Sequence, residues 1–357
     1  MPIFRRFRPL FIPIHGSASK TGPLNLEEIA KLSGVSRSTV SRVINNHPRV
    51  KPITRARVYE VIQRLDYHPS TAARRLAGGR TNILGLVIPM GVPRIFTDPF
   101  FALLIQGVSQ ACSANEHSVM LWVAEPEYER RTIRQVLQNK MIDGVIIASA
   151  ILDDPLLEAL MEGSLPFILV GRHPAAPQVS YVDVDNFNSS REMVTYLLRL
   201  GYRRIGTICG PQNMIAGLDR LEGYKAALRQ WELPVDPDFA IEGDFTEEGG
   251  YKAMQRLLPR RPQALFCASD AMAIGALRAL REASLRVPEN VAVASFDDLP
   301  SSAHSEPPLT TVRQPIQRMG AVAVETLMDI ITHPNMPPRS VILPTELVIR
   351  ASCCPAV

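Results

Sequence analysis

Short apolar runs of strand length alternate with amphipathic stretches of helical length beyond residue 80, and this pattern restricts the possible folds more than any other feature. The strand-like runs are 83–89, 119–124, 144–148, 167–170, 205–209, 264–267 and 291–296, with a last strand expected at 341–349. The helical stretches between them include 101–114, 129–139, 189–200, 223–231, 249–258 and 271–283. Such alternation predicts parallel sheets covered by helices on both faces. The strands are too many for one small sheet, so we expect two α/β subdomains, one after the other in the chain.

The charge distribution separates the N-terminal part of the chain from the rest. Residues 1–80 contain 15 Lys and Arg against 4 Asp and Glu, whereas residues 81–357 contain 24 against 31, although the net charge of the chain is only +4. A basic segment joined to an acidic body is typical of a protein whose basic end meets a polyanion. A basic tail with no specific partner is the alternative.

Three short helices are expected between residues 24 and 65. Asn25 and Glu28 have the spacing of a capping box, and Gly34 can end the first helix because glycine readily takes a left-handed backbone conformation. Ser36 is expected to cap the second helix, and Pro52 to open the third. The positions expected to face inward are Leu26, Ile29, Ala30, Leu32, Val35, Val40, Val43, Ile44, Val58, Val61, Ile62 and Leu65.

The second of these helices has a polar face of short hydroxyl side chains and two arginines, within the string GVSRSTVSRVINN at residues 34–46. Such side chains near a helix N-terminus suit contacts with base edges and phosphates in the major groove. An ordinary amphipathic helix with a solvated face would give a similar pattern. The glycine at the turn, the three-helix frame and the local positive charge favour a DNA-binding helix-turn-helix.

The same segment resembles the lactose/galactose-repressor (LacI-type) family of transcription regulators. The resemblance runs through LEEIAKLSGVSRSTVSRVINNHPRVKPITRARV and YHPSTAARRLAGGRTNILGLVIP, and it continues more loosely through most of the remaining chain. It implies an all-α helix-turn-helix headpiece, a hinge helix, and an α/β core of two doubly wound parallel-sheet subdomains like type I periplasmic binding proteins. The implied domains are the headpiece at 24–69, the hinge helix and linker at 70–80, and the effector-binding and dimerisation core at 81–357. Residues 1–23, which mix arginines with a short proline-rich apolar run, are expected to be a disordered extension.

The resemblance also implies residues that contact DNA. Arg37 and Ser38 match positions that read bases, with Arg42 close behind. In the hinge helix, Leu76 matches an apolar wedge that enters the minor groove and kinks the duplex; its alternative role is simply to begin the core. The residues expected to position the headpiece, mostly on phosphates, or to belong to the hinge helix are Ser36, Thr39, Ser41, Asn45, Arg49, Thr54 and Ala73.

Two positions depart from the family pattern. Ser70 stands where Asn is usual at the start of the hinge helix, and Ser can still act as a cap. Lys51 stands where a Ser-like cap precedes the third helix. We expect that cap to be weaker, although Lys51 could reach a phosphate instead.

The core sequence shows no catalytic constellation. It has no P-loop, no nucleophile elbow and no clustered His/Cys site, so we expect no enzyme activity, no cofactor and no metal. The pair Asp297–Asp298 could suggest acid–base chemistry, but neighbouring residues at a strand end point to opposite sides. The five cysteines lack metal or redox spacing and are expected to be free thiols. No stretch is long and apolar enough for a membrane span or a signal peptide, so we expect a cytoplasmic protein.

Polar residues at the C-terminal ends of strands mark a candidate ligand cleft, because these ends line the crevice of open α/β sheets. Arg172, Asp270 and Asp297 each follow such a strand, although each could instead cap a helix or form a salt bridge. The sequence alone leaves these alternatives open.

The family resemblance adds further positions to this cleft. Asp98 and Phe100 match the first effector-contacting loop of the core, and Arg220 in GLDRLEGY matches an arginine that holds ligand hydroxyls or carboxylates. Asp270 in ASDAMAIGAL and Asp297 in SFDD match further cleft positions. Carboxylates and arginine suit sugar hydroxyls, and an aromatic ring suits the apolar face of a sugar. We therefore expect a mono- or oligosaccharide effector.

We interpret the chain as a sequence-specific transcription regulator, a repressor that binds a pseudo-palindromic operator as a homodimer and is controlled by this effector. A dimer is expected rather than a tetramer because no heptad repeat follows the last strand. The alternatives are a nucleobase or protein coregulator as effector, or a sugar-binding α/β protein with residual enzyme activity. A periplasmic transport protein would need a signal peptide and would lack the basic headpiece.

Overall fold

The computed structural model describes residues 25–44, 47–67, 80–88, 95, 98–123 and 141–353. The chain divides into two compact units, Met1–Thr81 and Asn82–Val357, which we call the headpiece and the core and describe separately. The expected extension at 1–23, the hinge helix and the helix at 129–139 lie outside the described residues.

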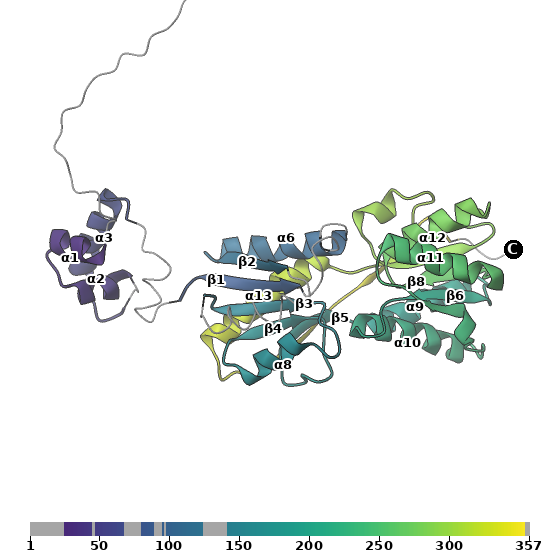
Figure 1. Ribbon diagram of the computed structural model, residues 1–357, viewed down its shortest axis with the longest axis horizontal. Helices are drawn as coiled ribbons and strands as arrows, with labels where there is room; N and C mark the ends of the chain where they lie inside the picture. The colour runs from purple at the N-terminus through teal and green to yellow at the C-terminus, as the bar shows by residue number, and fades with distance from the viewer. Residues whose placement is uncertain are drawn as a thin grey trace, which may run out of the picture. The chain divides into compact units, whose positions relative to one another are not determined.

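Three helices make up the described headpiece: α1 (Leu26–Ser33), α2 (Arg37–Ile44) and α3 (Pro52–Arg64) (Figure 1). The Asn25 side chain accepts hydrogen bonds from the backbone N–H groups of Glu27 and Glu28, and Gly34 ends α1 with a φ of +64°. The Ser36 hydroxyl accepts a hydrogen bond from the Thr39 backbone N–H at 3.2 Å, so it caps α2. Pro52 begins α3, and no side chain caps that helix. The expected caps and breaks are confirmed.

A small apolar core holds these helices together. Its buried members are Ile29, Ala30, Val40, Val43, Val58, Val61 and Tyr67, with Leu26, Val35, Val50, Ile44, Ile62 and Leu65 packed around them. The inward orientation expected for Leu32 is wrong, since this side chain is 52% exposed. Ser33 takes the inward position instead, and its hydroxyl donates a hydrogen bond to the Ile29 carbonyl at 2.5 Å.

The core contains two six-stranded sheets, each the centre of one lobe. The first sheet has the order β11-β5-β4-β3-β1-β2, and its strands are β1 (Ile83–Ile88), β2 (Ser118–Val123), β3 (Gly144–Ala148), β4 (Phe167–Val170), β5 (Tyr181–Val184) and β11 (Ser340–Leu343). The second has the order β12-β10-β9-β8-β6-β7, and its strands are β6 (Ile205–Cys209), β7 (Ala240–Glu242), β8 (Ala264–Cys267), β9 (Ala292–Asp297), β10 (Thr310–Arg313) and β12 (Glu346–Val348). All described pairings are parallel except β10 with β12.

Helices cover both sheets, which confirms the expected fold class of two parallel α/β subdomains (Figure 1). The helices of the first lobe are α6 (Pro99–Ala114), α8 (Pro155–Glu162) and α13 (Ile316–Thr332). Those of the second lobe are α9 (Asn186–Arg199), α10 (Ile215–Gln230), α11 (Glu247–Leu257) and α12 (Asp270–Glu282). The expected helical stretches did not include α8, α13 or the first half of α10, although Pro155, Pro315 and Pro211 stand at or before their starts as turn signals.

The expectation that the lobes follow one another in sequence is wrong. The described chain passes between the lobes after β5, after β10 and again after β11. Helix α13 returns to the first lobe, where it packs on α6 so closely that a Cβ atom at Gly107 would meet the Gln317 backbone. The single strand expected at 341–349 is two strands in different sheets. Pro344, which has no N–H to donate to a ladder, separates them.

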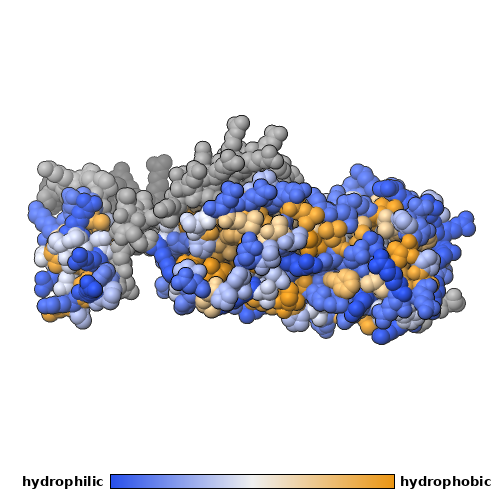
Figure 2. All heavy atoms as spheres, turned by 90° about the horizontal axis from the view of Figure 1, so that it is seen from below, coloured by the Kyte–Doolittle hydropathy of each residue, from blue (hydrophilic) through white to orange (hydrophobic). Residues whose placement is uncertain are grey.

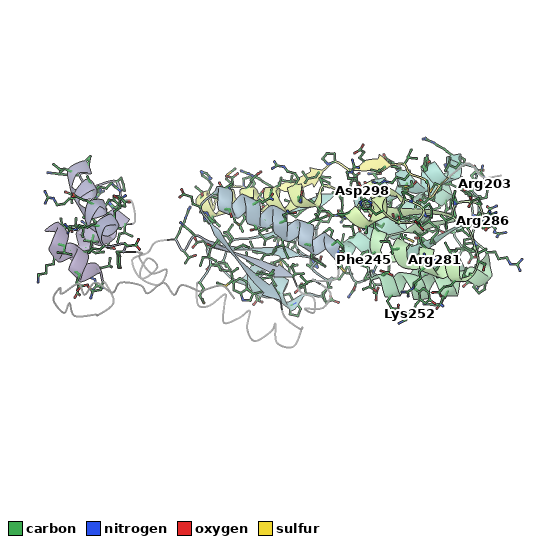
Figure 3. The ribbon with its side chains drawn as sticks, turned by 90° about the horizontal axis from the view of Figure 1, so that it is seen from above. Arg203, Phe245, Lys252, Arg281, Arg286 and Asp298 are labelled. Atoms are coloured by element: carbon green, nitrogen blue, oxygen red, sulfur yellow. The ribbon has the colours of Figure 1, made fainter. Side chains whose placement is uncertain are left out.

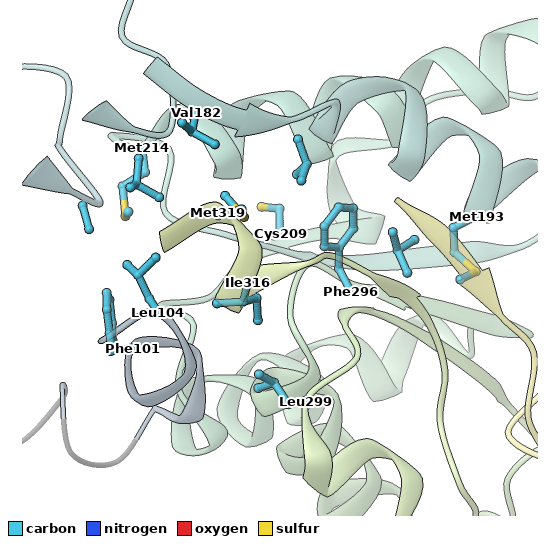
Figure 4. Close-up of a cluster of buried hydrophobic side chains, with 14 of the residues drawn as sticks. Phe101, Leu104, Val182, Met193, Cys209, Met214, Phe296, Leu299, Ile316 and Met319 are labelled. Atoms are coloured by element: carbon cyan, nitrogen blue, oxygen red, sulfur yellow. The ribbon is translucent and has the colours of Figure 1, made fainter. Parts of the chain in front are cut away.

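One cluster of buried apolar side chains runs from the first lobe into the second (Figure 4). It joins Phe101 and Leu104 of α6 to Phe296 of β9 and Ile316 of α13. On the face shown in Figure 2, hydrophilic residues interrupt the apolar patches of the core. The described residues of the headpiece are mainly hydrophilic on this face. None of the helices in the described ranges is both long and apolar enough to cross a bilayer.

Candidate functional site

Two adjoining cavities lie between the lobes of the core. The inner chamber, of about 450 Å³, is lined by Asp98, Phe100, Phe101, Ser149, Met214, Ala216, Arg220, Phe245, Ser269, Asp297 and Gln314. The hinge chamber, of about 540 Å³, shares Phe100, Ser149, Met214, Ala216, Arg220 and Gln314 with it and reaches the strand ends near Arg172 and Asp183.

Arg220 forms the centre of the polar wall of the inner chamber. It lies in the middle of α10 with its side chain only 6% exposed. Nε donates a hydrogen bond to Asn186 Oδ1 at 2.9 Å, and Nη1 donates to the Ala268 carbonyl at 2.6 Å and to Asp297 Oδ1 at 3.3 Å. The guanidinium carbon also lies 3.7 Å from the centroid of the Phe296 ring. These contacts hold the guanidinium in one orientation against the cavity.

Asp297 lies opposite Arg220 at the end of β9. Its Oδ1 also accepts a hydrogen bond from Gln314 Nε2 at 2.6 Å. Burial, helped by the nearby carboxylates of Asp270 and Asp98, raises the pKa of Asp297 to about 8, although Arg220 opposes that shift. Asp297 can therefore hold a proton near neutral pH and both donate and accept hydrogen bonds to a ligand.

The neighbouring Asp298 points elsewhere, as expected for a strand end. Backbone φ angles of +119° at Asp297 and +57° at Asp298 turn the chain sharply. Asp298 accepts hydrogen bonds from Arg313 Nε at 2.6 Å and Arg350 Nη2 at 2.7 Å, away from the inner chamber. The two aspartates therefore do not form a catalytic pair.

A second buried carboxylate, that of Asp183, is connected to Arg220 through the side chain of Asn186. Asp183 accepts hydrogen bonds from the backbone N–H groups of Arg172 and Val184 and from Asn186 Nδ2 at 3.1 Å. Burial raises its pKa above the usual value. Because Asn186 then accepts from Arg220, this chain of hydrogen bonds links the end of β4 in the first lobe to α10 in the second.

Arg172 itself makes an ion pair between the lobes. Its Nη2 lies 2.6 Å from each carboxylate oxygen of Asp219, which is on α10 beside Arg220. The Arg172 side chain remains 42% exposed and lines the hinge chamber. The structure thus places Arg172 beside the cavity, but with its guanidinium bound to protein.

Asp98 and Phe100 reach the cavity from the start of α6. Asp98 caps that helix by accepting a hydrogen bond from the Phe100 backbone N–H at 3.0 Å. The Phe100 ring lies edge-to-face with Phe101 at 5.3 Å between centroids. Both Asp98 and Phe100 line the inner chamber, as the family resemblance implies.

Asp270 does not line either chamber, and its expected ligand contact needs correction. Its Oδ1 accepts hydrogen bonds from Ser295 Oγ at 2.5 Å and Thr311 Oγ1 at 2.7 Å, and its Oδ2 accepts from the Leu299 backbone N–H. The side chain is fully buried, so it fixes the ends of β8, β9 and β10 to one another. The preceding Ser269 lines the inner chamber instead.

Several lining residues were missed by sequence reasoning. The most informative is Phe245, which follows β7 and whose backbone has a φ of +63°, a region that bulky residues rarely adopt. Other missed residues that line a chamber include Ser149, Asp183, Asn186, Met214, Ser269 and Gln314. Gln314 follows β10, whose sequence TTVR has no apolar run that would mark it as a strand, and so the rule about strand ends could not be applied to it.

The candidate DNA-contacting residues that the structure describes are all exposed or half-buried. Arg37, Ser38, Arg42 and Arg49 are exposed, while Val40 and Val43 are buried on the opposite side of α2. Ser36, Thr39, Ser41 and Thr54 belong to the same polar set and are exposed or half-buried. Asn45, Ala73 and Leu76 lie outside the described residues.

The remaining reactive side chains offer no other chemistry in the described ranges. Cys112, Cys209, Cys267 and Cys353 are buried free thiols, and burial raises the pKa of Cys112 and of Cys209 to about 11. No group of His, Cys, Asp or Glu in the part of the chain that the structure describes could hold a metal ion.

A basic helix-turn-helix headpiece, linked in one chain to a two-lobed core with a polar cavity between its lobes, defines a ligand-responsive DNA-binding transcriptional regulator. Comparison with known proteins agrees with this class. Residues 25–70 match the family model of bacterial regulatory proteins of the lacI family, and residues 194–353 match a periplasmic binding protein-like domain.

The full-length similarities are equally consistent. The chain is 41% identical over 331 residues to the HTH-type transcriptional regulator CelR of Thermobifida fusca, covering 92% of this chain and 97% of CelR. A solved CelR–cellobiose complex superposes with a TM-score of 0.74 at 39% identity, covering 92% of this chain and 100% of that one. A lac repressor dimer bound to operator superposes with a TM-score of 0.78 at 25% identity, covering 93% and 99%.

The chain belongs to the lacI family of bacterial regulatory proteins. It is a DNA-binding transcriptional regulator with the expected headpiece and periplasmic-binding-protein-like core. The relatives named above are regulators rather than enzymes, in keeping with the expectation for this chain.

Proposed function

We propose that this regulator is a cytoplasmic repressor that binds a pseudo-palindromic operator as a homodimer and is controlled by a neutral sugar held between the lobes of its core. The observation that carries the sugar assignment is the buried pair of Arg220 and Asp297, which faces a cavity with aromatic walls. A few fixed polar groups in an otherwise apolar site are what a polyhydroxylated ligand requires. The solved CelR complex holds cellobiose, and its high similarity supports the same ligand class here.

The proposed sugar contacts differ slightly from those expected from sequence. Asp98, Phe100, Arg220 and Asp297 all line the inner chamber, and Phe245 joins them from the second lobe. Arg172 is proposed to act at the edge of the hinge chamber. We leave Asp270 out of the set, because its carboxylate is already held by three protein groups.

The proposed control of DNA binding follows from the position of this cavity. A ligand that touches both lobes favours the arrangement of lobes that fits it, and only such a difference in affinity between two states can shift an equilibrium. Two headpieces in a dimer would match a two-fold symmetric site. The base contacts are assigned to Arg37, Ser38 and Arg42, and the central minor-groove contact to Leu76, which lies outside the described residues.

A nucleobase is the second candidate effector. Phe100 and Phe245 enter the inner chamber from opposite lobes, and two aromatic rings could enclose a planar base. The sugar is preferred because Asp98, Arg220 and Asp297 match vicinal hydroxyl groups better than a planar heterocycle.

One experiment tests both assignments. The full-length protein is screened by thermal shift and calorimetry against glucose, cellobiose, maltose, maltotriose and ribose, together with adenine, guanine and hypoxanthine. DNA selected by the protein from a random library is then titrated with and without each hit. We expect a sugar to bind and to change operator affinity, and we expect that affinity to fall steeply with salt. A purine hit with no sugar hit contradicts the sugar assignment, and a lack of any sequence preference contradicts the regulator model.

A further inference from the structure

A group of exposed arginines lies at the edge of the second sheet that is opposite the ligand cavity. The strands β6, β8 and β9 are parallel neighbours, so the loops that precede them share one edge of the sheet. These loops, 201–204, 259–263 and 284–291, contain five arginines, one acidic residue and no lysine. We call the five residues the arginine edge, and they are Arg203, Arg204, Arg260, Arg261 and Arg286, all exposed.

The arginine edge is remote from the ligand site. Ser269 and Asp297 line the inner chamber at the C-terminal ends of β8 and β9, whereas the arginines precede the same strands. Figure 3 shows Arg203 and Arg286 on the side of the second lobe that lies away from Phe245, another residue of the inner chamber. The function proposed above therefore gives these arginines no role.

Gln263 holds the three loops together. Its side-chain oxygen accepts hydrogen bonds from the backbone N–H groups of Arg203 at 3.1 Å and Arg204 at 3.0 Å. Its backbone carbonyl accepts a hydrogen bond from the N–H of Ala292, which follows the third loop, at 3.0 Å. The arginines of the three loops are therefore carried on one fixed surface.

Neutral groups hold two of the guanidinium groups in place. Arg203 Nη1 donates a hydrogen bond to the Leu198 carbonyl at 2.9 Å, and its guanidinium lies 5.3 Å from the centroid of the Trp231 ring. Arg204 Nη2 donates a hydrogen bond to the Arg261 carbonyl. A carbonyl or an aromatic face orients a guanidinium but does not neutralise it, so the positive charge remains available to a partner.

The lack of carboxylate partners distinguishes this edge from the rest of the core. Elsewhere in the described core, away from this edge, every lysine and arginine except Arg191 forms an ion pair with Asp or Glu. At the arginine edge, Arg260 pairs with Asp238 at 2.5 Å. The other four arginines form no ion pair with any residue that the structure describes.

The helix dipole explains some positive charge near this edge but not the charge in the loops. Arg199, Arg256 and Arg281 occupy the last turns of α9, α11 and α12, where a cation is favourable. That effect falls off within the last turn, whereas the arginine edge lies beyond the ends of these three helices. The loop arginines therefore add like charges that repel one another, at a cost that a bound anion would offset.

The composition of the edge fits a protein segment better than a nucleic acid. Arginine and tryptophan are enriched at protein interfaces and among the residues that dominate their binding energy, whereas lysine is depleted there. A guanidinium also binds a carboxylate through two parallel hydrogen bonds. Residues 81–357 contain 24 Lys and Arg against 31 Asp and Glu, so a long duplex that extends past the edge would meet net negative charge.

We propose that the arginine edge is a docking surface for an acidic, carboxylate-rich segment of a partner protein. The guanidinium groups of Arg203, Arg204, Arg261 and Arg286 bind its carboxylates, and the half-buried Trp231 ring lies beside them. Such a partner leaves the ligand cavity free, so the regulator would have a protein contact that is separate from its small-molecule effector.

The test is a titration of the full-length protein into a labelled peptide of alternating Glu and Ser residues, followed by fluorescence anisotropy. The same peptide with Gln in place of Glu and a duplex of random sequence are the comparison ligands. The edge variant is Arg261→Glu with Arg286→Glu, because neither side chain forms a hydrogen bond or ion pair with the described residues. Arg261→Gln with Arg286→Gln is a milder form should the charge reversal disturb folding.

The matched control is Lys252→Glu with Arg318→Glu. It changes the net charge by the same amount on side chains that are 68% and 58% exposed and lie outside the arginine edge. Each of these residues forms only a surface ion pair, which contributes little to stability. The basic headpiece is the same in every protein, so any peptide that it binds adds equally to all the measurements.

We expect the edge variant to bind the acidic peptide about tenfold or more weakly, and the control to stay within about twofold of the unaltered protein. Added salt should weaken binding of the acidic peptide, and the Gln peptide should not bind. Equal losses in the edge variant and the control, or no binding of the acidic peptide by the unaltered protein, would overturn the proposal. A loss of duplex affinity in the edge variant as large as its loss of peptide affinity would assign the edge to nucleic acid instead.

Discussion

Nη2 of Arg172 lies 2.6 Å from both carboxylate oxygens of Asp219, so an ion pair joins the end of β4 in the first lobe to α10 in the second. The next residue along α10 is Arg220, which faces the inner chamber. Of these two adjacent residues of α10, Asp219 therefore contacts the other lobe and Arg220 lines the ligand cavity. This adjacency gives a direct physical route by which occupancy of the cavity can favour one arrangement of the lobes.

The first prediction concerns this pair. Arg172→Met and Asp219→Asn should each weaken sugar binding by roughly threefold to tenfold, since a partly exposed ion pair contributes only about 1 kcal/mol. The double variant should lose little more than either single variant, because both remove the same interaction. Calorimetry on the four proteins measures the coupling. Additive losses would mean that Arg172 contacts the sugar itself rather than acting through Asp219.

The second prediction concerns Arg220. Arg220→Lys should lower sugar affinity by about tenfold to 100-fold, because the single ammonium group of Lys cannot bond Asn186, Ala268 and Asp297 together, and a hydrogen bond to a charged group contributes about 1.5–3 kcal/mol. Arg229→Lys on the exposed side of α10 is the matched control and should leave affinity unchanged. Gel-shift titration should show that the Arg220 variant still binds operator but no longer responds to sugar. Normal sugar affinity in that variant would remove Arg220 from the site.

The third prediction is a pH dependence with its sign set by Asp297. Burial raises the pKa of Asp297 to about 8 in the folded protein, whereas the unfolded chain releases this proton near about 3.9. Between these values the folded state binds more protons, so the free energy of unfolding that this group contributes falls as pH rises from about 4 to about 8. Asp297→Asn has no titrating carboxyl group, so the fall in the free energy of unfolding that Asp297 causes is absent in this variant. Its Tm relative to the unaltered protein should therefore be higher at pH 8 than at pH 5.

Asp298→Asn is the control for that measurement and should show no such trend between pH 5 and pH 8. Although burial raises the pKa of Asp298, hydrogen bonds from Arg313 and Arg350 outweigh it and hold the pKa below its usual value. The stability contributed by Asp298 is present above about pH 4 and is lost as pH falls through its folded pKa. The Asn variant should thus be less stable at pH 5 and pH 8 alike. A rising relative Tm for both variants would show that the trend does not come from Asp297.

The fourth prediction separates the headpiece from the core. Ser36→Ala removes the cap of α2 and should destabilise the headpiece by about 1 kcal/mol. Specific DNA affinity should fall while sugar binding, measured by calorimetry, stays the same. Ser36→Asn restores a capping side chain and should recover much of the loss. If Asn fails to restore DNA affinity although the helix is stable, Ser36 contacts the DNA directly.

Much of the headpiece could be predicted from sequence because its determinants are local. Asn25, Gly34, Ser36 and Pro52 each act within a few residues of their own position, and all four do what their spacing predicts. Leu32 is the exception. Its exposure depends on which neighbour of an eight-residue helix faces α3, and apolar periodicity over so short a helix does not settle that.

In the core, too, some features follow from local sequence patterns and others only from the tertiary structure. Alternation of strands and helices by itself determined two parallel α/β lobes, because the period of apolar residues reflects burial on one or both faces. Only the tertiary structure decided that α13 returns to the first lobe, that Pro344 splits the last strand, and that the Asp270 carboxylate turns inward. It also brought Arg220 to Asp297 and Arg172 to Asp219. These partners lie far apart in the chain, and their meeting depends on how the chain crosses between lobes, which no local pattern of residues encodes.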